Sequence, residues 1–240
     1  MAKEKKESKQ KPSKEKYINR KAKLDSIIKL ITKSKYSIAD ASELLPKISL
    51  SKFNGSCNLD VTLQLKQKQA NETVRGSIVF PHQFGEQKKV LVLAQPDKVS
   101  SALEAGADYA GLEDMVEKIE KGWLDFDVVI ATPQVMPKIA KLGKVLGPRQ
   151  LMPNPKTGTV TDNLDNAIKL YKSGKVDFKM DAGKTIKLRF AKCEMTATDI
   201  TANLTAALDA IKAETRKLGP TVIKKIMVSP TMGPKLVVEM

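Results

Sequence analysis

Residues 125–161 read DFDVVIATPQVMPKIAKLGKVLGPRQLMPNPKTGTVT, and this stretch decides the fold of the middle of the chain. Its apolar segment Val128–Ala131 predicts a buried strand that ends at Thr132-Pro133, and Val135–Val145 then has the spacing of an amphipathic helix. Leu146–Thr161 follows with three prolines and two glycines. Because proline fixes φ and removes a backbone donor, we expect this last segment to be an ordered, stiff loop.

A second short apolar run lies upstream, at Lys89–Ala94 (KVLVLA). Such nearly continuous apolar strands are typical of parallel sheets that are covered on both faces. Helical patterns lie between and after these two strands, at Asp97–Ala105, Leu112–Gly122 and Leu164–Lys172. This alternation of strands and helices predicts a small Rossmann-like unit.

The flanking regions have a different pattern, because apolar and polar residues alternate along Cys57–Leu65 as in a strand with one buried face. The remaining expected strands are Thr73–Phe80, Lys175–Met180, Thr185–Phe190, Lys224–Val228 and Lys235–Val238, with a turn at Asp181–Lys184. The expected helices are Lys14–Lys33, Ser37–Leu45 (ended by Pro46) and Asp199–Lys217. These elements predict an antiparallel sheet covered by helices.

The sequence therefore predicts a mixed α/β protein made of an α+β outer domain and an inserted Rossmann-like three-layer domain. The outer domain is expected to be discontinuous, at residues 17–81 and 174–240, with the insert at 82–173 and a disordered basic tail at 1–16. The chain crosses between the domains twice. We expect a hinge at these crossings, formed by Pro81, His82, Gly85 and Gly174, although a rigid pair of domains is the alternative.

The net charge of +15 is unevenly distributed along the 240 residues. It is +7 over residues 1–23, +3 over 24–81, zero over 82–173 and +5 over 174–240. A polyanion such as RNA is therefore expected to contact the outer domain and to avoid the insert, unless the lysines serve solubility alone. The apolar runs are too short to cross a bilayer and no secretory signal opens the chain, so a cytoplasmic protein without a membrane partner is expected.

Groups that could carry catalysis or bind a metal are scarce in the sequence. The chain has one histidine, His82, and two cysteines, Cys57 and Cys193, which lack metal-ligand spacing and are expected to be reduced thiols. The glycine-rich fingerprints of nucleotide-binding sheets do not occur either. We therefore expect no catalytic residues, no metal and no cofactor, and keep a nucleotide-dependent enzyme as the second hypothesis.

Three basic or polar passages of the outer domain are candidates for RNA contact. Lys52 and Phe53, with Ser56, lead into the first strand, where Phe53 could stack on a base or simply belong to the core. Lys175 and Lys179 lie on an expected strand that could equally be an ordinary solvated sheet face. The last passage contains Thr231, Met232 and Gly233, which a plain hairpin turn also explains.

Three passages in the same order resemble one known family, that of the bacterial large-subunit stalk protein called ribosomal protein L-one. They are the run 125–161, the passage from Val74-Arg75-Gly76 to Pro81-His82, and Pro230-Thr231-Met232-Gly233-Pro234, and the similarity extends from about Tyr17 to the C-terminus. Among the departures, Gln150 stands where the family mostly has glycine, and Asn54-Gly55-Ser56-Cys57 is smaller than usual.

This resemblance implies a structural protein of the 50S ribosomal subunit, monomeric when free, that binds large-subunit rRNA at the mobile stalk. It also implies help in releasing deacylated tRNA from the exit site and translational repression through the protein's own mRNA. By the same resemblance the rRNA-binding residues are Lys52, Phe53, Ser56, Lys175, Lys179, Thr231, Met232 and Gly233. An RNA chaperone or tRNA-binding factor acting away from the ribosome is the third hypothesis.

Overall fold

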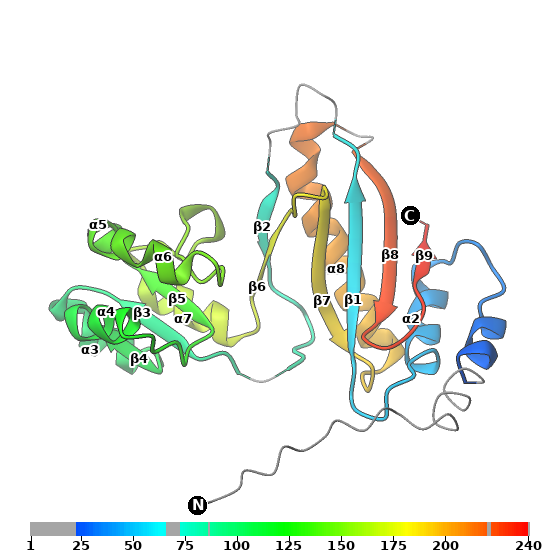
Figure 1. The fold of residues 1–240 in the computed structure, drawn as a ribbon, viewed down its shortest axis with the longest axis horizontal. Coiled ribbons are helices and arrows are strands. Elements are labelled where there is room, and N and C mark those ends of the chain that lie inside the picture. The colour runs from blue at the N-terminus through cyan, green and yellow to red at the C-terminus, as the bar shows by residue number, and fades with distance from the viewer. Residues whose placement is uncertain (1–22, 66–72, 86, 220–221, 240) are drawn as a thin grey trace, which may run out of the picture.

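A computed structural model describes residues 23–65, 73–85, 87–219 and 222–239. The predicted tail at 1–16 lies outside these residues. The same is true of the first part of the predicted helix Lys14–Lys33, of which residues 23–30 are described and helical. The described chain forms two lobes, one around an antiparallel sheet and one around a parallel sheet (Figure 1).

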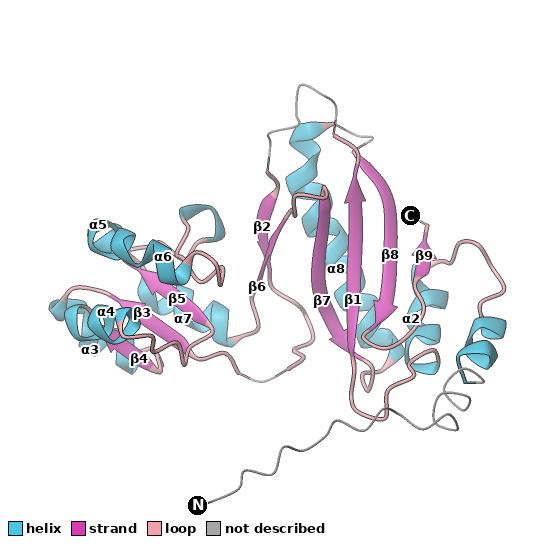
Figure 2. Cartoon of the chain, viewed as in Figure 1, coloured by secondary structure: helices cyan, strands magenta, loops and turns pink. Residues whose placement is uncertain are grey.

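The first lobe, here called the outer body, is built on a four-stranded antiparallel sheet with the order β7-β1-β8-β9. Its strands are β1 (Ser56–Leu63), β7 (Thr185–Lys192), β8 (Ile223–Pro230) and β9 (Leu236–Val238). The helices α2 (Ile38–Lys47) and α8 (Ala197–Thr215) lie together behind this sheet (Figure 2). The central strand β1 therefore pairs with two strands that come more than a hundred residues later in the chain, as Thr62 opposite Thr185 and Lys225 shows.

Strand β1 alternates as its sequence predicts, with Cys57, Leu59, Val61 and Leu63 buried and the residues between them partly exposed. The buried side chains face a helix stripe that the sequence also predicts, formed by Ile200, Leu204, Ala207, Leu208 and Ile211 of α8. Burying one such aliphatic side chain contributes about 1.5–3 kcal/mol. The other face of the sheet carries no helix among the described residues, and we call it the open sheet face.

Two short strands, β2 (Arg75–Ile78) and β6 (Val176–Lys179), pair antiparallel as a separate ribbon. The Phe178 ring packs across Gly76, where a Cβ would lie only 2.7 Å from it. The predicted turn Asp181–Lys184 connects β6 and β7, and Asp181 N donates to Thr185 O across it at 2.9 Å. Beyond a bridge between Met180 and Ile186, β6 leaves β7 and pairs with β2.

The second lobe contains the parallel sheet β4-β3-β5, formed by Tyr109–Gly111, Val90–Leu93 and Val128–Ala131. Side chains of β3 point alternately to its two faces and are all buried, which explains the continuous apolar run. Val90 and Val92 pack with residues of α3 (Pro96–Glu104) and α7 (Leu164–Lys172). Leu91 and Leu93 pack on the opposite side, with α4 (Glu113–Glu120) and the turns that follow β5. The predicted three-layer arrangement is thus confirmed.

Two helix predictions need correction. Val135–Val145 is a series of short turns, η2 (Pro133–Val135), α5 (Met136–Ile139), η3 (Ala140–Leu142) and α6 (Gly143–Leu146), since Pro137 and Gly143 weaken a regular helix there. Pro46 lies inside the last turn of α2 instead of ending it.

The loop after α6 is ordered, as predicted. It contains the 3-10 turn η4 (Pro155–Thr157), and the Thr159 hydroxyl accepts a hydrogen bond from Asn154 N at 2.6 Å. Ala131 of β5 donates to Thr159 O at 2.9 Å and accepts from Thr161 N at 3.1 Å. The loop is therefore tied to the end of the parallel sheet. The mixed α/β fold class is confirmed, whereas the exact domain boundaries stay a prediction.

Candidate nucleic-acid interface

Two of the three predicted passages meet at the N-terminal end of β1. The loop of residues 51–56 enters β1 there, and the turn Ser229–Pro234 leaves β8 beside it. The Thr231 hydroxyl accepts a hydrogen bond from Ser56 N at 3.0 Å and donates one to Ser56 O at 2.9 Å. Leu50 N donates to Met232 O at 2.7 Å. The structure thus brings Ser56, Thr231 and Met232 together, and uses the Thr231 hydroxyl to join the loop to the turn.

Two large apolar side chains are exposed on this pair of segments. Phe53 is 61% exposed and Met232 is 37% exposed, and Lys52 beside Phe53 is exposed as well. The alternative that Phe53 belongs to the core is therefore wrong. An exposed aromatic ring next to a lysine is a suitable surface for stacking on a base or ribose.

Gly233 has a packing reason to be glycine. A Cβ on this residue would lie 2.6 Å from Ile48 O and 2.6 Å from Pro230 Cγ, closer than carbon atoms pack. The absence of a side chain lets the turn Ser229–Pro234 rest against the end of α2. Gly233 therefore fixes the position of Met232, its neighbour in the chain.

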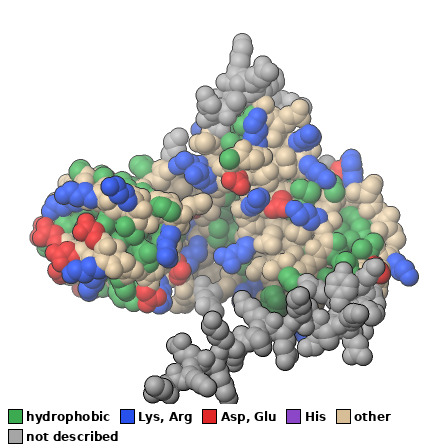
Figure 3. Space-filling model, viewed as in Figure 1, with side chains coloured by type: hydrophobic (Ala, Val, Ile, Leu, Met, Phe, Trp, Pro, Cys, Tyr) green, Lys and Arg blue, Asp and Glu red, His purple; other side chains and the backbone are tan. Residues whose placement is uncertain are grey.

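The open sheet face extends from this end and carries basic side chains (Figure 3). Lys187 and Arg189 of β7 and Lys225 of β8 are exposed, and their register places them opposite Asp60, Asn58 and Thr62 of β1. The acidic residue on this face, Asp60, forms an ion pair with Lys235 at 2.9 Å. Lys225 and Lys235 were not among the residues predicted from the sequence. The alternation of polar and apolar residues could have suggested that both lysines are exposed, but it does not show which neighbouring strand they lie beside.

The third predicted passage lies elsewhere, on the ribbon between the lobes. Lys179 is exposed there, opposite Arg75. Lys175 is buried, and its ammonium donates to Thr157 O at 2.8 Å and lies 4.9 Å from the centre of the Tyr171 ring. The charge of Lys175, the residue before β6, is thus used in a contact with the η4 turn, and a contact of Lys175 with RNA stays a prediction.

A small polar cluster surrounds that contact. The Tyr171 hydroxyl donates to Asp177, 3.1 Å from the nearer carboxylate oxygen, and Lys88 Nζ donates to Lys175 O. Burial raises the pKa of Asp177, although the hydrogen bond from Tyr171 and the charges of Lys175 and Lys88 oppose that shift. Burial, with help from Asp177, also raises the pKa of Tyr171, so this hydroxyl keeps its proton and acts as a donor.

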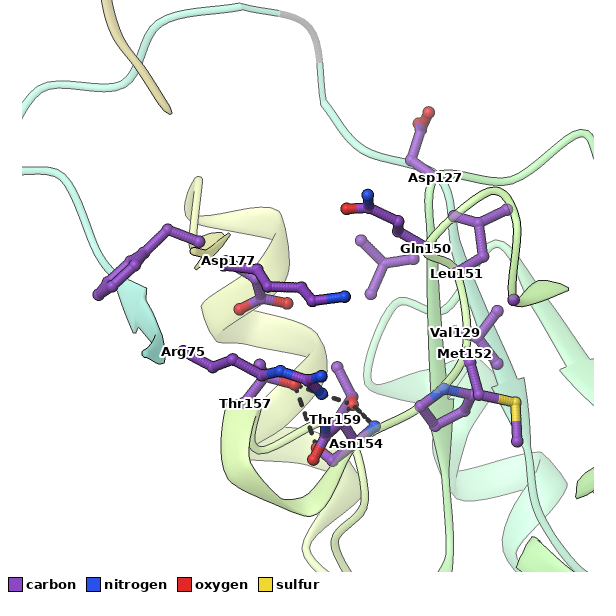
Figure 4. A pocket seen from close by; sticks show the side chains of 15 residues that line it. Arg75, Asp127, Val129, Gln150, Leu151, Met152, Asn154, Thr157, Thr159 and Asp177 are labelled. Atoms are coloured by element: carbon purple, nitrogen blue, oxygen red, sulfur yellow. Dashed lines mark hydrogen bonds between the residues drawn. The ribbon is translucent and has the colours of Figure 1, made fainter. Parts of the chain in front are cut away.

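A cleft of about 340 Å³ lies beside this cluster (Figure 4). Arg75, Asp177 and Lys179 line it from the ribbon, and residues 150–154 with Thr157 line it from the loop. Arg75 points from β2 toward Asn154 and Thr157 (Figure 4). The two lobes thus meet through polar groups.

The predicted hinge residues lie where the chain crosses between the lobes. His82 is held to α8, because its N–H donates to Asn203 Oδ1 at 3.1 Å and its carbonyl accepts from Asn203 Nδ2 at 2.9 Å. Gly85 and Gly174 have positive φ values of 103° and 89°, which suit glycine. A Cβ on Gly174 would lie 3.5 Å from Gln83 Cγ, so the two crossing segments adjoin. Whether they act as a hinge stays a prediction.

Other kinds of site find little support in the described ranges. No group of three or more His, Cys, Asp or Glu side chains that could hold a metal occurs there. No described helix is long and apolar enough to cross a membrane. A polar, basic sheet face beside an exposed aromatic ring is typical of nucleic-acid-binding proteins.

Comparisons with known proteins agree with this class. Residues 45–234 match the family model described as the Ribosomal protein L1p/L10e family. The Large ribosomal subunit protein uL1 of Phocaeicola vulgatus is 45% identical over 199 residues, which cover 82% of this chain and 86% of that protein. The protein of the same name from Lactobacillus acidophilus is 41% identical, and the match covers 88% of this chain and 92% of that protein. The one from Limosilactobacillus reuteri is 38% identical, and the match covers 90% of this chain and 94% of that protein.

The chain therefore belongs to the ribosomal protein L1p/L10e family. It is a ribosomal protein and takes part in translation, so the hypothesis of a nucleotide-dependent enzyme is wrong.

Proposed function

We propose that this protein is a structural constituent of the large ribosomal subunit that binds large-subunit rRNA through its outer body. The observation that carries the proposal is the junction of the 51–56 loop with the turn Ser229–Pro234, which presents Phe53 and Met232 at the edge of a basic sheet face. Two hydrogen bonds through Thr231 preorganise this junction, so little conformational entropy is lost when RNA binds.

The chemistry of the surface fits folded RNA. Stacking of a base or ribose on Phe53 would contribute about 1–3 kcal/mol. The lysines and arginine of the open sheet face would contact phosphates, which makes the affinity dependent on salt. The hydroxyl of Ser56, which is partly exposed, can add a contact to a 2′-hydroxyl.

We further propose the division into domains given by the sequence, with the rRNA-binding domain at residues 17–81 and 174–240 and the insert at 82–173. The described lobes support it, since their buried cores contain different residues. The contact between the lobes is polar and includes the carboxylate of Asp177, which accepts a hydrogen bond from the Tyr171 hydroxyl. Such an interface can open, and the crossings at Pro81–Gly85 and Gly174 are then its hinge.

Three finer roles follow from the family and complete the proposal. The protein would act on the cytoplasmic ribosome at the mobile stalk, would assist release of deacylated tRNA from the exit site, and would repress translation by binding its own mRNA. The names of the relatives support only a place in the large ribosomal subunit, and the three roles rest on the resemblance to the family. The same rRNA-binding surface would serve the mRNA.

Binding to a stalk rRNA fragment tests the surface directly. Phe53→Ala and Met232→Asp should each weaken binding at least about tenfold without lowering thermal stability, a loss of the size expected for one stacking contact. Leu103→Ala removes a comparably exposed apolar side chain from α3 of the insert and serves as the control. Wild-type affinity in both loop variants would contradict the proposed interface.

Three further measurements address the alternatives and the division into domains. Affinity of the wild type should fall by orders of magnitude between about 50 and 200 mM salt if six or more phosphates are contacted. Co-sedimentation with large subunits, rather than with free RNA, separates a ribosomal constituent from a chaperone. A variant in which a short linker replaces residues 82–173 should still bind the fragment, and loss of binding in a folded variant would refute the division of labour.

A further inference from the structure

Two thiols lie in contact beneath the proposed RNA-binding loop. Cys57 Sγ and Cys193 Sγ are 3.7 Å apart, although the residues are 136 positions apart in the chain. Cys57 is the second residue of β1 and is fully buried, whereas Cys193 follows the last residue of β7 and is partly exposed. Both cysteines are free.

Two hydrogen bonds join the segment of Cys193 to the loop, and Gly55 beside the Cys193 sulfur has no side chain that would fill the space. The N–H of Cys193 donates to Gly55 O at 2.8 Å. Its sulfur lies 3.6 Å from the position of a Cβ on Gly55. The next residue, Glu194, accepts a hydrogen bond from Asn54 Nδ2 at 2.7 Å. Any displacement of Cys193 is therefore transmitted to the residues that follow Phe53.

We propose that Cys57 and Cys193 form an oxidation site for peroxides, which converts the pair to a disulfide and thereby alters the loop that carries Lys52 and Phe53. The second half of this inference rests on the proposed RNA-binding function. The first half rests on the geometry of the two sulfurs alone.

The reaction begins at Cys193, the accessible thiol. Its sulfur attacks one oxygen of hydrogen peroxide, the O–O bond breaks, and Cys193 sulfenic acid and one water form. Cys57 sulfur then attacks the oxidised sulfur, the S–O bond breaks, and the hydroxyl leaves as a second water with the Cys57 proton. Two thiols are oxidised and one peroxide is reduced. Burial and the neighbouring thiol raise the pKa of Cys57, so this sulfur stays a thiol and does not compete with Cys193 for peroxide in the first step.

Bond formation must change the local structure. A disulfide has an S–S length of about 2.05 Å, so the sulfurs must approach each other by about 1.6 Å from their present separation of 3.7 Å. Cys57 is fixed in the core between β7 and β8, so Cys193 and Glu194 are the residues that move. This movement strains the Asn54–Glu194 hydrogen bond and shifts the loop.

Thiol counting on the full chain tests the oxidation site. The protein is treated with hydrogen peroxide and then with a maleimide, and its intact mass and cross-linked peptides are measured. The wild type should lose both reactive thiols together and yield a Cys57–Cys193 peptide, which dithiothreitol should restore to two thiols. Cys57→Ser should stop at a sulfenic acid that dimedone traps on Cys193. Two unmodified thiols, independent sulfinic acids, or disulfides between molecules would overturn the proposal.

Binding of the stalk rRNA fragment tests the consequence. Oxidised wild type should bind about tenfold more weakly than reduced wild type, and Cys193→Ala should bind equally well with and without peroxide. Formation of the disulfide with unchanged affinity would refute the link to the loop while the oxidation site stands. Failure of the reduced protein to bind would refute the proposed function and leave the thiol measurement unaffected.

Discussion

Removal of the Asn203 amide should destabilise the outer body by a predictable amount. Asn203 is fully buried on α8, and its amide makes three hydrogen bonds. Two go to the backbone of His82, at 3.1 and 2.9 Å, and the third goes to Phe190 O at 2.9 Å. The pairing of β1 with β7 has a bulge at Phe190, because Asn58 lies opposite Arg189 and Cys57 lies opposite Ala191. The Phe190 carbonyl therefore has no partner in β1 and needs the Asn203 amide as its donor.

The expected magnitude follows from these three bonds. A buried carbonyl left without a donor costs about 1–3 kcal/mol, which applies to Phe190. The His82 groups lie near solvent, so water replaces their lost bonds in part and each adds about 0.5–1 kcal/mol. Asn203→Ala should therefore lower the free energy of unfolding by about 2–5 kcal/mol. Asn203→Asp keeps the acceptor for His82 N–H but loses both donated bonds, so it should destabilise as well.

Urea unfolding at fixed temperature measures this change, with the m-value as a check that the same surface unfolds. Thr205→Ala alters an exposed hydroxyl of the same helix and should stay within about 0.5 kcal/mol of the wild type. Hydrogen exchange of residues 81–85 should also accelerate in Asn203→Ala. A loss below about 0.5 kcal/mol would refute the reasoning that this amide supports the bulge and anchors the crossing segment.

Two other predictions follow from packing and from charge. Gly233→Ala should cost about 1–3 kcal/mol through overpacking against Ile48 O and should weaken RNA binding as well; wild-type stability in urea would contradict this. Asp177 has a raised pKa in the folded protein, so its contribution to stability is largest below its ordinary pKa of 3.8 and is lost as pH rises through the raised value. Asp177→Asn, which keeps an acceptor for Tyr171, should therefore flatten the dependence of stability on pH in that range. Asp209→Asn, an exposed carboxyl, is the control, and equal pH profiles for Asp177→Asn and wild type would contradict the assignment.

The sequence predicts local periodicity well and long-range pairing poorly. The alternation of β1 and the buried run of β3 were read correctly because burial acts on neighbouring residues of one strand. Strand β4, Tyr109–Gly111, was missed because it has three residues, none of them fully buried. The β2–β6 ribbon was missed because partner choice depends on residues a hundred positions away.

In the candidate site, too, local features were predicted from the sequence and long-range contacts were not. The exposed positions of Phe53 and Met232 fit the passages chosen from the sequence, and their meeting through Thr231 is a tertiary fact that periodicity does not contain. Lys175 was expected to face RNA, since charge normally favours solvent. Its burial depends on Thr157 and Tyr171, which belong to the other lobe and could not be connected to it from the sequence.

The central position of β1 constrains the order in which the chain can fold during synthesis. Thr62 emerges from the ribosome early, but its neighbours Thr185 and Lys225 are made only after all three strands of the parallel sheet. Both edges of β1 must therefore wait unpaired while the parallel sheet forms from strands that lie close together in the chain. The outer body, and with it the proposed RNA-binding surface, is completed only when the last strands have been translated.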